Sequence, residues 1–196
     1  ADFDEAFAAS RRALELEPRM PEAYIARAML LSVQGRTDEA QKDFEEAIRL
    51  NPASFDAHYL YARHCFQGGE FERAVPLYEE AIRLRPDDYQ ALCLLEGSLL
   101  KLGRMEQHAE VARRAMQAID RQLVIDPRDG RALQLGTTNA ARLGLRDKTR
   151  DLAARALKAR PDAFSSYYNV ACAYAILGDL DDALEMLDHA VQHGRG

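Results

Sequence analysis

The stretch that decides the fold is residues 19–52, RMPEAYIARAMLLSVQGRTDEAQKDFEEAIRLNP. Apolar residues recur at helical spacing in both of its halves, at Tyr24, Ala28 and Leu31 and then at Ala40, Phe44, Ala47 and Ile48. Gly35 separates the halves, where a positive φ costs glycine little, and Pro52 follows the second half, where a helix must stop. The stretch therefore predicts a helical hairpin.

The same punctuation recurs along the chain. The prolines that match Pro52 are Pro18, Pro52, Pro86, Pro127 and Pro161, at intervals of 34, 34, 41 and 34 residues. The glycines that follow these prolines by 17 residues are Gly35, Gly69, Gly103, Gly144 and Gly178. We therefore predict one all-α repeat domain over residues 1–196, with no strand. Its units are 1–18, which has only a second helix, then 19–52, 53–86, 87–127, 128–161 and 162–196.

Small residues occupy fixed places in these units. One column in the second helices holds Ala13, Ala47, Ala81, Ala115, Ala156 and Ala190, and another holds Ala6, Ala40, Ala74, His108, Thr149 and Ala183. A facing column in the first helices holds Ala28, Ala62, Glu96, Thr137 and Ala171. Small side chains let two helices approach closely, and a single hairpin cannot bury both of its faces. The expected structure is therefore a stack of hairpins.

Composition excludes several classes of protein. With 47% hydrophobic and 30% charged residues, the chain is neither a disordered tail nor collagen-like. We expect no membrane span and no signal peptide, because no apolar run is long enough. A net charge of −6 argues against generic nucleic-acid binding. The three cysteines, Cys65, Cys93 and Cys172, form no close pair, which favours a reducing, cytoplasmic compartment over a disulfide framework or a zinc site.

The repeat resembles the tetratricopeptide repeat (TPR) family. The resemblance rests on the 34-residue period, an aromatic residue near the start of the first helix, and the pattern Gly35, Ala40, Phe44, Ala47 and Pro52. It covers nearly the whole chain and implies a right-handed superhelix of helical hairpins, an α-α solenoid whose inner surface binds a peptide or another protein. The run YNVACAYA at 168–175 also looks like repeat regions attached to bacterial signalling proteins such as kinases and cyclases.

The resemblance implies that first-helix residues pointing away from the paired second helix line an inner groove. The residues expected there are Ile25, Met29, Tyr59, Arg63, Phe66, Lys101, Arg131, Gln134, Thr138, Arg142, Tyr168 and Asn169. Such a wall suits an extended or helical peptide with some negative charge, although ordinary solvated surface is an equally good interpretation. Family members that grip a terminal carboxylate use Lys and Asn at positions held here by Ile25, Met29 and Leu60, so that clamp is not expected.

The expected function is a protein-binding module, not an enzyme, with no cofactor and no metal. Its expected partner is a protein or peptide, and neither a membrane nor nucleic acid. The alternative is a structural spacer or self-association domain within a multidomain signalling protein. The lone helix at the start and the lack of a polar capping helix at the end predict a fragment of a longer protein, with exposed apolar ends through which two copies would dimerise.

The 41-residue interval is the main departure from the repeat. Its seven extra residues fall between Gly103 and Pro127, where apolar residues continue at alternating spacings of four and three. They are Met105, Ala109, Ala112, Met116, Ile119 and Leu123. Seven residues add about 10 Å of helix, so we predict one long helix from about Met105 to Ile125 that projects beyond its neighbours.

Two units replace small core residues by polar ones. Glu96 and His108 face each other in unit 87–127, as either a charge-assisted hydrogen bond between helices or an acid–base pair for chemistry. We favour the structural interpretation, because no nucleophile or metal ligand stands beside them. Thr137 and Thr149 hold the same positions in the next unit, which predicts that the two hydroxyls satisfy each other.

Basic residues gather late in the chain. Between residues 142 and 160 they are Arg142, Arg146, Lys148, Arg150, Arg155, Lys158 and Arg160, against two acids, Asp147 and Asp151. A solvated helix face is the favoured interpretation, and a patch for an acidic partner or nucleic acid is the alternative.

Overall fold

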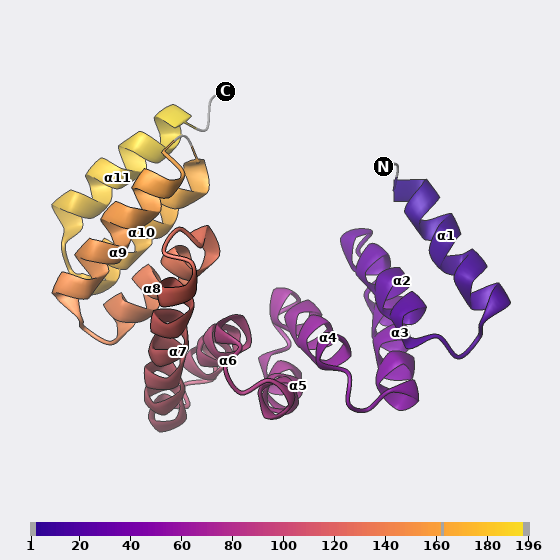
Figure 1. Ribbon diagram of the computed structural model, residues 1–196. Helices are drawn as coiled ribbons and strands as arrows, with labels where there is room; N and C mark the ends of the chain where they lie inside the picture. The colour runs from indigo at the N-terminus through magenta and orange to yellow at the C-terminus, as the bar shows by residue number, and fades with distance from the viewer. Residues whose placement is uncertain (1–2, 162, 194–196) are drawn as a thin grey trace. The chain divides into compact units, whose positions relative to one another are not determined.

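The computed structural model describes residues 3–161 and 163–193, and every regular element in these ranges is an α-helix (Figure 1). The helices are α1 (Phe3–Leu16), α2 (Pro21–Val33), α3 (Thr37–Leu50), α4 (Phe55–Gln67), α5 (Phe71–Leu84), α6 (Tyr89–Lys101), α7 (Met105–Ile125), α8 (Gly130–Arg142), α9 (Arg146–Ala159), α10 (Phe164–Leu177) and α11 (Leu180–His193). The predicted class, an all-α repeat of helical hairpins, is confirmed.

The chain divides into two compact units. The N-terminal unit comprises residues 1–87 with 101–103, and the C-terminal unit comprises residues 88–100 with 104–196. The N-terminal unit holds α1 to α5, in which α2 packs on α3 and α4 packs on α5. In the C-terminal unit α8 packs on α9 and α10 packs on α11. First helices of successive hairpins also pack together, α2 with α4 and α8 with α10.

The turn inside each hairpin needs glycine for its backbone. The residues with positive φ in the described ranges are Gly35, Gly69, Gly103, Gly144 and Gly178, with φ between 68° and 82°. After Gly35 the backbone N–H of Arg36 donates to the carbonyl of Leu31 over 3.0 Å, which ends the helix in a left-handed cap. The predicted role of these five glycines is confirmed.

The prolines act through the residue before them. Four residues each follow a second helix and directly precede a proline: Asn51, Arg85, Asp126 and Arg160. Their backbones are no longer helical, with φ between −127° and −143°. Proline clashes with a helical conformation at the preceding residue, so each second helix ends two residues before its proline. The chain is thereby cut into hairpins of regular length.

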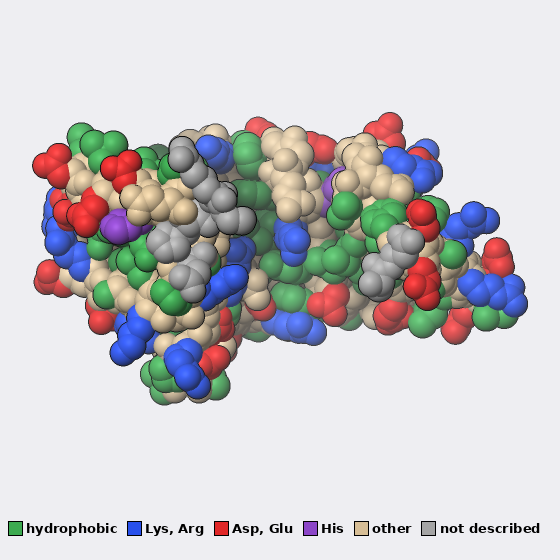
Figure 2. Space-filling view, turned by 90° about the horizontal axis from the view of Figure 1, so that it is seen from above, with side chains coloured by type: hydrophobic (Ala, Val, Ile, Leu, Met, Phe, Trp, Pro, Cys, Tyr) green, Lys and Arg blue, Asp and Glu red, His purple; other side chains and the backbone are tan. Residues whose placement is uncertain are grey.

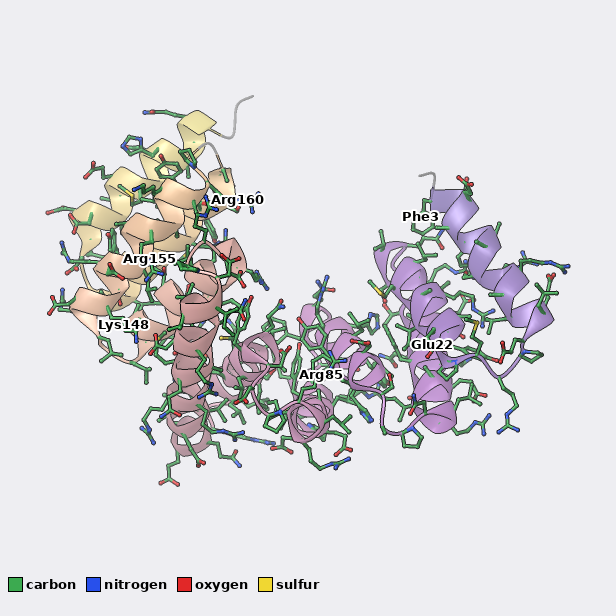
Figure 3. All side chains as sticks on the ribbon, viewed as in Figure 1. Phe3, Glu22, Arg85, Lys148, Arg155 and Arg160 are labelled. Atoms are coloured by element: carbon green, nitrogen blue, oxygen red, sulfur yellow. The ribbon has the colours of Figure 1, made fainter. Side chains whose placement is uncertain are left out.

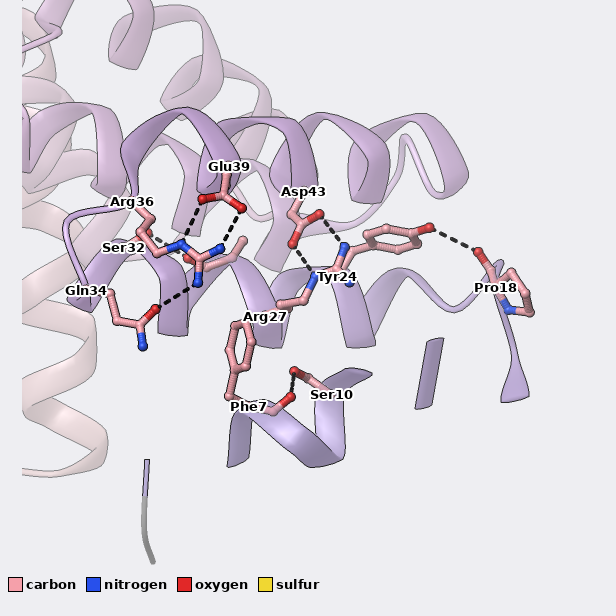
Figure 4. Close-up of polar contacts among 11 residues, drawn as sticks. Phe7, Ser10, Pro18, Tyr24, Arg27, Ser32, Gln34, Arg36, Glu39 and Asp43 are labelled. Carbon is pink, nitrogen blue, oxygen red and sulfur yellow. Dashed lines mark hydrogen bonds and ion pairs between the residues drawn. The ribbon is translucent and has the colours of Figure 1, made fainter. Parts of the chain in front are cut away.

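The core is built from the small columns and the large side chains between them. Ala28, Ala40, Ala47 and Ala62 have no exposed surface, and the neighbouring Phe44 is 1% exposed. An ion pair crosses the edge of the same hairpin (Figure 4): the Arg27 guanidinium donates to both carboxylate oxygens of Asp43, over 2.6 and 2.7 Å. Apolar burial and this two-point contact together fix α2 against α3.

The longest helix is α7, which has the bounds that the apolar spacing predicts, Met105–Ile125. Ala112, Met116, Ile119 and Leu123 are buried along one face, whereas Met105 at its start is 55% exposed. At its other end Val124 and Ile125 are 82% and 80% exposed. The extra turns therefore bury one face and present apolar side chains to solvent at their end.

One predicted contact is wrong. Thr137 and Thr149 are fully buried, but their hydroxyls do not satisfy each other. Thr137 donates to the carbonyl of Leu133 over 2.8 Å, and Thr149 donates to that of Leu145 over 2.9 Å, each four residues back in its own helix. A threonine on a helix can reach that carbonyl without a partner helix, so neither hydroxyl needs the other.

Candidate functional site

The inner face of the N-terminal unit carries a pocket between its two first helices. α2 and α4 pack side by side, and a cavity of about 120 Å³ opens between them. Its lining residues are Met29, Ser32, Val33, Phe44, Leu60, Arg63, His64 and Gln67. Two predicted groove residues, Met29 and Arg63, therefore lie at one site.

The pocket combines exposed apolar surface with a positive charge. Met29 is 42% exposed and Val33 is 80% exposed, although both sit on a helix that is otherwise well packed. Arg63 is exposed, and no described carboxylate forms an ion pair with its guanidinium. Exposed apolar side chains beside an available cation are typical of a surface that a partner covers.

His64 adds a polar atom without a partner. It is buried at 9% exposure, its ring lies 5.8 Å from that of Phe44, and its Nε2 has no hydrogen-bond partner within the described ranges. Burial lowers the pKa of His64 and favours the neutral ring, while Glu70 acts in the opposite direction. A buried nitrogen without a partner is uncommon, so an incoming group would gain by bonding to it.

Three other predicted groove residues of the N-terminal unit serve the packing of the hairpins. Ile25 is buried at 8% exposure. Tyr59 stacks on Phe55 with ring centroids 5.4 Å apart, and Phe66 meets the ring of Phe71 edge-on at the same distance. Their side chains contribute to the fold at least as much as to the surface.

The C-terminal unit has its own inner face on α8 and α10. Arg131 is exposed on α8, whereas Gln134, Thr138 and Asn169 are half-buried. Tyr168 is 47% exposed and stacks on Phe164, with centroids 5.9 Å apart. These side chains present a ring pair and an arginine to solvent. Lys101, at the end of α6, is exposed and belongs to the N-terminal unit.

Arg142 forms an ion pair with a buried carboxylate. Its guanidinium pairs with Oε2 of Glu96, a residue with no exposed surface, and Nδ1 of His108 lies 3.1 Å from Oε1 of the same carboxylate. Burial raises the pKa of Glu96, and Arg142 and His108 act against that rise. The carboxylate thus pairs with groups from α7 and α8, but its Oε1 has no hydrogen-bond partner among the described residues, and the hydrogen-bond contact of His108 Nδ1 is instead with the backbone carbonyl of Glu96, 3.4 Å away.

Two of the three cysteines are buried thiols without activation. Cys65 and Cys93 are buried, and burial raises the pKa of each thiol to about 12. Both are therefore protonated at neutral pH, and Cys65 fills the core as a small apolar side chain. Among the residues that the structure describes, no three His, Cys, Asp or Glu side chains gather closely enough to hold a metal ion.

The run of basic residues splits into two groups. Arg146 and Arg150 pair with Asp179 over 2.6 and 3.0 Å, and Lys148 pairs with Asp120 over 2.6 Å. Lys158 and Arg160, further along, form no ion pair with any described residue. The first group is a solvated helix face whose charges are paired, and the second group has no ion-pair partner among the described residues and could bind an acidic group.

The last helix exposes apolar side chains. Leu180, Leu184, Leu187 and Val191 follow one another at helical spacing on α11, with 62%, 61%, 38% and 50% of their surfaces exposed. Figure 2 shows hydrophobic side chains reaching the surface among charged ones. The expected apolar surface near an end of the chain is therefore present, and we call these four residues the α11 stripe.

Sequence reasoning missed Ser32, His64 and Gln67, which all line the inner pocket. The signal that finds two of them is helical periodicity, because residues 60, 63, 64 and 67 share one face of α4. The other two predicted positions of α4, 59 and 66, lie on a neighbouring face, where Tyr59 and Phe66 contact Phe55 and Phe71. None of the described helices is long and apolar enough to cross a bilayer.

Comparisons with known proteins identify the repeat. One model of the tetratricopeptide repeat matches residues 25–89 and 66–122, and a second matches residues 164–192. YrrB, described as a TPR protein with an unusual peptide-binding site, is 23% identical over 94% of this chain and 92% of its own, with a TM-score of 0.63. The TPR protein TTC0263 of Thermus thermophilus is 23% identical over 89% and 97%, with a TM-score of 0.65.

A third similar structure is much larger. In the Cut9–Hcn1 hetero-tetramer of the APC/C, a chain 16% identical to this one aligns with 98% of it and 37% of its own length, with a TM-score of 0.74. At these identities the likeness concerns the fold. No curated protein matches the sequence.

Proposed function

Because this chain belongs to the tetratricopeptide repeat family, whose repeats generally serve as protein-interaction scaffolds and not as catalysts, we propose that it binds a segment of another protein on the inner faces of its first helices. The observation that carries the proposal is the pocket between α2 and α4. It joins exposed apolar surface, a cation without an ion-pair partner among the described residues and a buried nitrogen without a hydrogen bond to any of them.

The lining of the pocket specifies the chemistry of the segment. An apolar side chain would cover Met29, Val33 and Leu60, which supplies most of the affinity. An acidic group on the same segment would pair with Arg63, and a donor or acceptor would bond to Nε2 of His64 according to its tautomer. An extended or helical peptide with an apolar anchor and a carboxylate meets these requirements.

The C-terminal unit offers a second surface of the same type. The exposed ring pair of Phe164 and Tyr168 supplies an aromatic anchor, and Arg131 supplies a charge. YrrB shares the fold and is described as having a peptide-binding site, which supports peptide recognition by such hairpins. We place this activity in the cytoplasm, because Cys65 and Cys93 are free thiols, as is Cys172.

The test compares a double variant of the pocket with a control arginine reversal on another helix. The double variant Val33→Glu/Arg63→Glu alters the pocket, and Arg83→Glu on α5 makes the same charge reversal at a second-helix residue whose side chain is 66% exposed. Immobilised wild-type protein and both variants are used to capture proteins from cell extract, with quantitative mass spectrometry of the bound fraction. We expect the double variant to lose at least tenfold of its specific partner and Arg83→Glu to retain it. Equal capture by all three proteins would show that the inner pocket is not the binding site.

Self-association is a second candidate function, and the α11 stripe favours it. Four apolar residues on one helix face, each more than a third exposed, match the surface that a second copy would bury. A spacer without partners would not need this surface.

A further inference from the structure

A second pocket lies in the C-terminal unit, away from the inner faces. It has a volume of about 390 Å³ and is lined by Pro127, Arg128, Leu133, Arg155, Lys158 and Ala159. These residues come from the turn between α7 and α8, from α8, and from the end of the second helix α9. We call it the edge pocket. None of the predicted inner-face residues lines it, and its size is that of a ligand-binding site.

Arg155 holds the edge pocket together. Its Nη2 donates to the carbonyl of Pro127 over 3.3 Å, which joins α9 to the turn after α7, and its Nη1 lies 3.3 Å from a carboxylate oxygen of Asp151. Arg155 and Arg160 are labelled in Figure 3. The side chain of Arg160 lies against the start of α8, since its Cδ is 3.5 Å from where a Cβ on Gly130 would stand. A fourth cation therefore lies at the start of α8, next in sequence to the lining residue Ala159.

The charges of the edge pocket are not balanced from within. Three cations line it, and no acid among the residues that the structure describes does. Arg128 and Lys158 form no ion pair with any residue that the structure describes. The nearby carboxylates of Asp126 and Asp129 accept hydrogen bonds from other groups. Asp126 accepts from the backbone N–H of Arg128, and Asp129 accepts from the Gln122 side chain and from the backbone N–H of Ala132 at the start of α8.

The edge pocket also has an apolar side. Pro127, Leu133 and Ala159 contribute to its lining, and the exposed Val124 and Ile125 precede it on α7. A phosphate or a nucleic-acid backbone would leave this surface uncovered. No aromatic side chain lines the pocket for base stacking, and the chain has a net charge of −6. An acidic peptide with an apolar side chain fits both its charge and its lining.

We propose that the edge pocket is a second docking site, for a protein segment in which Asp or Glu residues flank a Leu, Ile, Val or Phe. The apolar side chain enters between Pro127 and Ala159, and the flanking carboxylates pair with Arg128, Lys158 and Arg160. The proposal goes beyond the inner-face function, because it concerns another surface and names the chemistry of the segment.

The test is a selection with the full chain. A phage library of random peptides, each about 16 residues long, is first depleted on the variant Arg128→Gln/Lys158→Gln and then selected on the wild type. We expect peptides with acidic residues beside one large aliphatic or aromatic residue. Fluorescence anisotropy of the strongest peptide should show at least tenfold weaker binding to Arg128→Gln/Lys158→Gln, and weaker binding to the wild type at about 200 mM than at about 50 mM salt.

A matched control separates the site from the net charge. Arg146→Gln/Lys148→Gln removes two cations from the same helix, and both already have ion-pair partners. It should bind the peptide within twofold of the wild type, and so should Val33→Glu/Arg63→Glu, so that failure here is distinct from failure of the inner-face function. Selected peptides without acidic residues, equal weakening by both glutamine pairs, or tighter binding of an oligothymidylate at Arg128 and Lys158 would each overturn the proposal.

Discussion

Replacing Arg142 by methionine should destabilise the C-terminal unit by about 3 kcal/mol near neutral pH. The substitution removes the guanidinium that pairs with Glu96 but keeps most of the apolar stem. Glu96 has no exposed surface, so its carboxylate cannot turn to water for compensation. The remaining neighbour is His108, whose Nδ1 lies 3.1 Å from Oε1.

The magnitude follows from burial. Removing one partner of a buried ion pair costs about 3–5 kcal/mol, because the other charge is left without compensation. The lower end applies here, because the side chain of Arg142 is 28% exposed and His108 stays in place. With a urea m-value of about 2 kcal/mol/M, the unfolding midpoint should fall by about 1.5 M.

The loss of stability caused by Arg142→Met should grow as the pH rises. Burial holds the pKa of Glu96 above its ordinary value of 4.5, so the folded state keeps the proton to higher pH than the unfolded chain does. The contribution that the protonated carboxyl of Glu96 makes to the free energy of unfolding is therefore present at low pH, and it is lost as the pH rises through the pKa of Glu96 in the folded state. Without Arg142 that pKa rises further, so the deficit at about pH 5 should be smaller than the deficit at about pH 7.5.

Urea unfolding followed by circular dichroism at both pH values tests this reasoning. Arg63→Met is the matched control, because Arg63 is an inner-face arginine without an ion pair among the described residues, and its loss should change stability by less than about 0.5 kcal/mol. In Glu96→Met/Arg142→Met the buried charge is gone, so most of the stability should return. A loss below about 1 kcal/mol for Arg142→Met, or no recovery in the double variant, would refute the account.

Two further predictions concern the surface and the turns. Leu180→Glu/Leu184→Glu should lower the self-association that light scattering detects at rising protein concentration. The control Leu16→Glu, at a residue of α1 that is 69% exposed, should leave self-association unchanged. A monomeric wild type would contradict self-association through the α11 stripe. Gly144→Ala should cost about 1–2 kcal/mol by thermal or urea unfolding, because its φ is 71° although nothing lies within 4 Å of an added Cβ. Gly130→Ala is the control and should be near neutral, since its added Cβ would meet only the Arg160 stem at 3.5 Å, and an equal cost at both positions would contradict the conformational explanation.

The fold was predictable because its signals are local and repeated. A glycine that must adopt positive φ and a proline that forbids helix before it recur at fixed intervals, so each hairpin is bounded by two independent backbone constraints. The bounds of α7 were predictable for a related reason. Its apolar residues from Ala109 to Leu123 keep one face through the seven extra residues, which a loop would not do.

The candidate sites were less predictable because they depend on which side chains meet. Helical position indicated that Met29 and Arg63 point away from the hairpin, and the structure brings them to one pocket. It could not show that Arg142 reaches Glu96 in the preceding first helix, 46 residues earlier. Nor could it show that His64 would be buried with Nε2 unpaired, since burial depends on how Phe44 packs against it.

The contrast between paired and unpaired cations along α9 and at its end follows from which residues lie opposite them. Lys148 meets Asp120 and Arg155 meets the carbonyl of Pro127, and both contacts join residues 28 positions apart. The two contacts therefore share one sequence offset, which shows that the two segments run side by side in the same direction. At the same offset of 28, Lys158 and Arg160 correspond to Gly130 and Ala132 at the start of α8, which carry no carboxylate, and neither cation forms an ion pair with a described acid. The exposed Val124 and Ile125 end α7 just before Pro127, so unpaired cations and apolar side chains occur together here, and this combination is what the edge pocket offers to a partner.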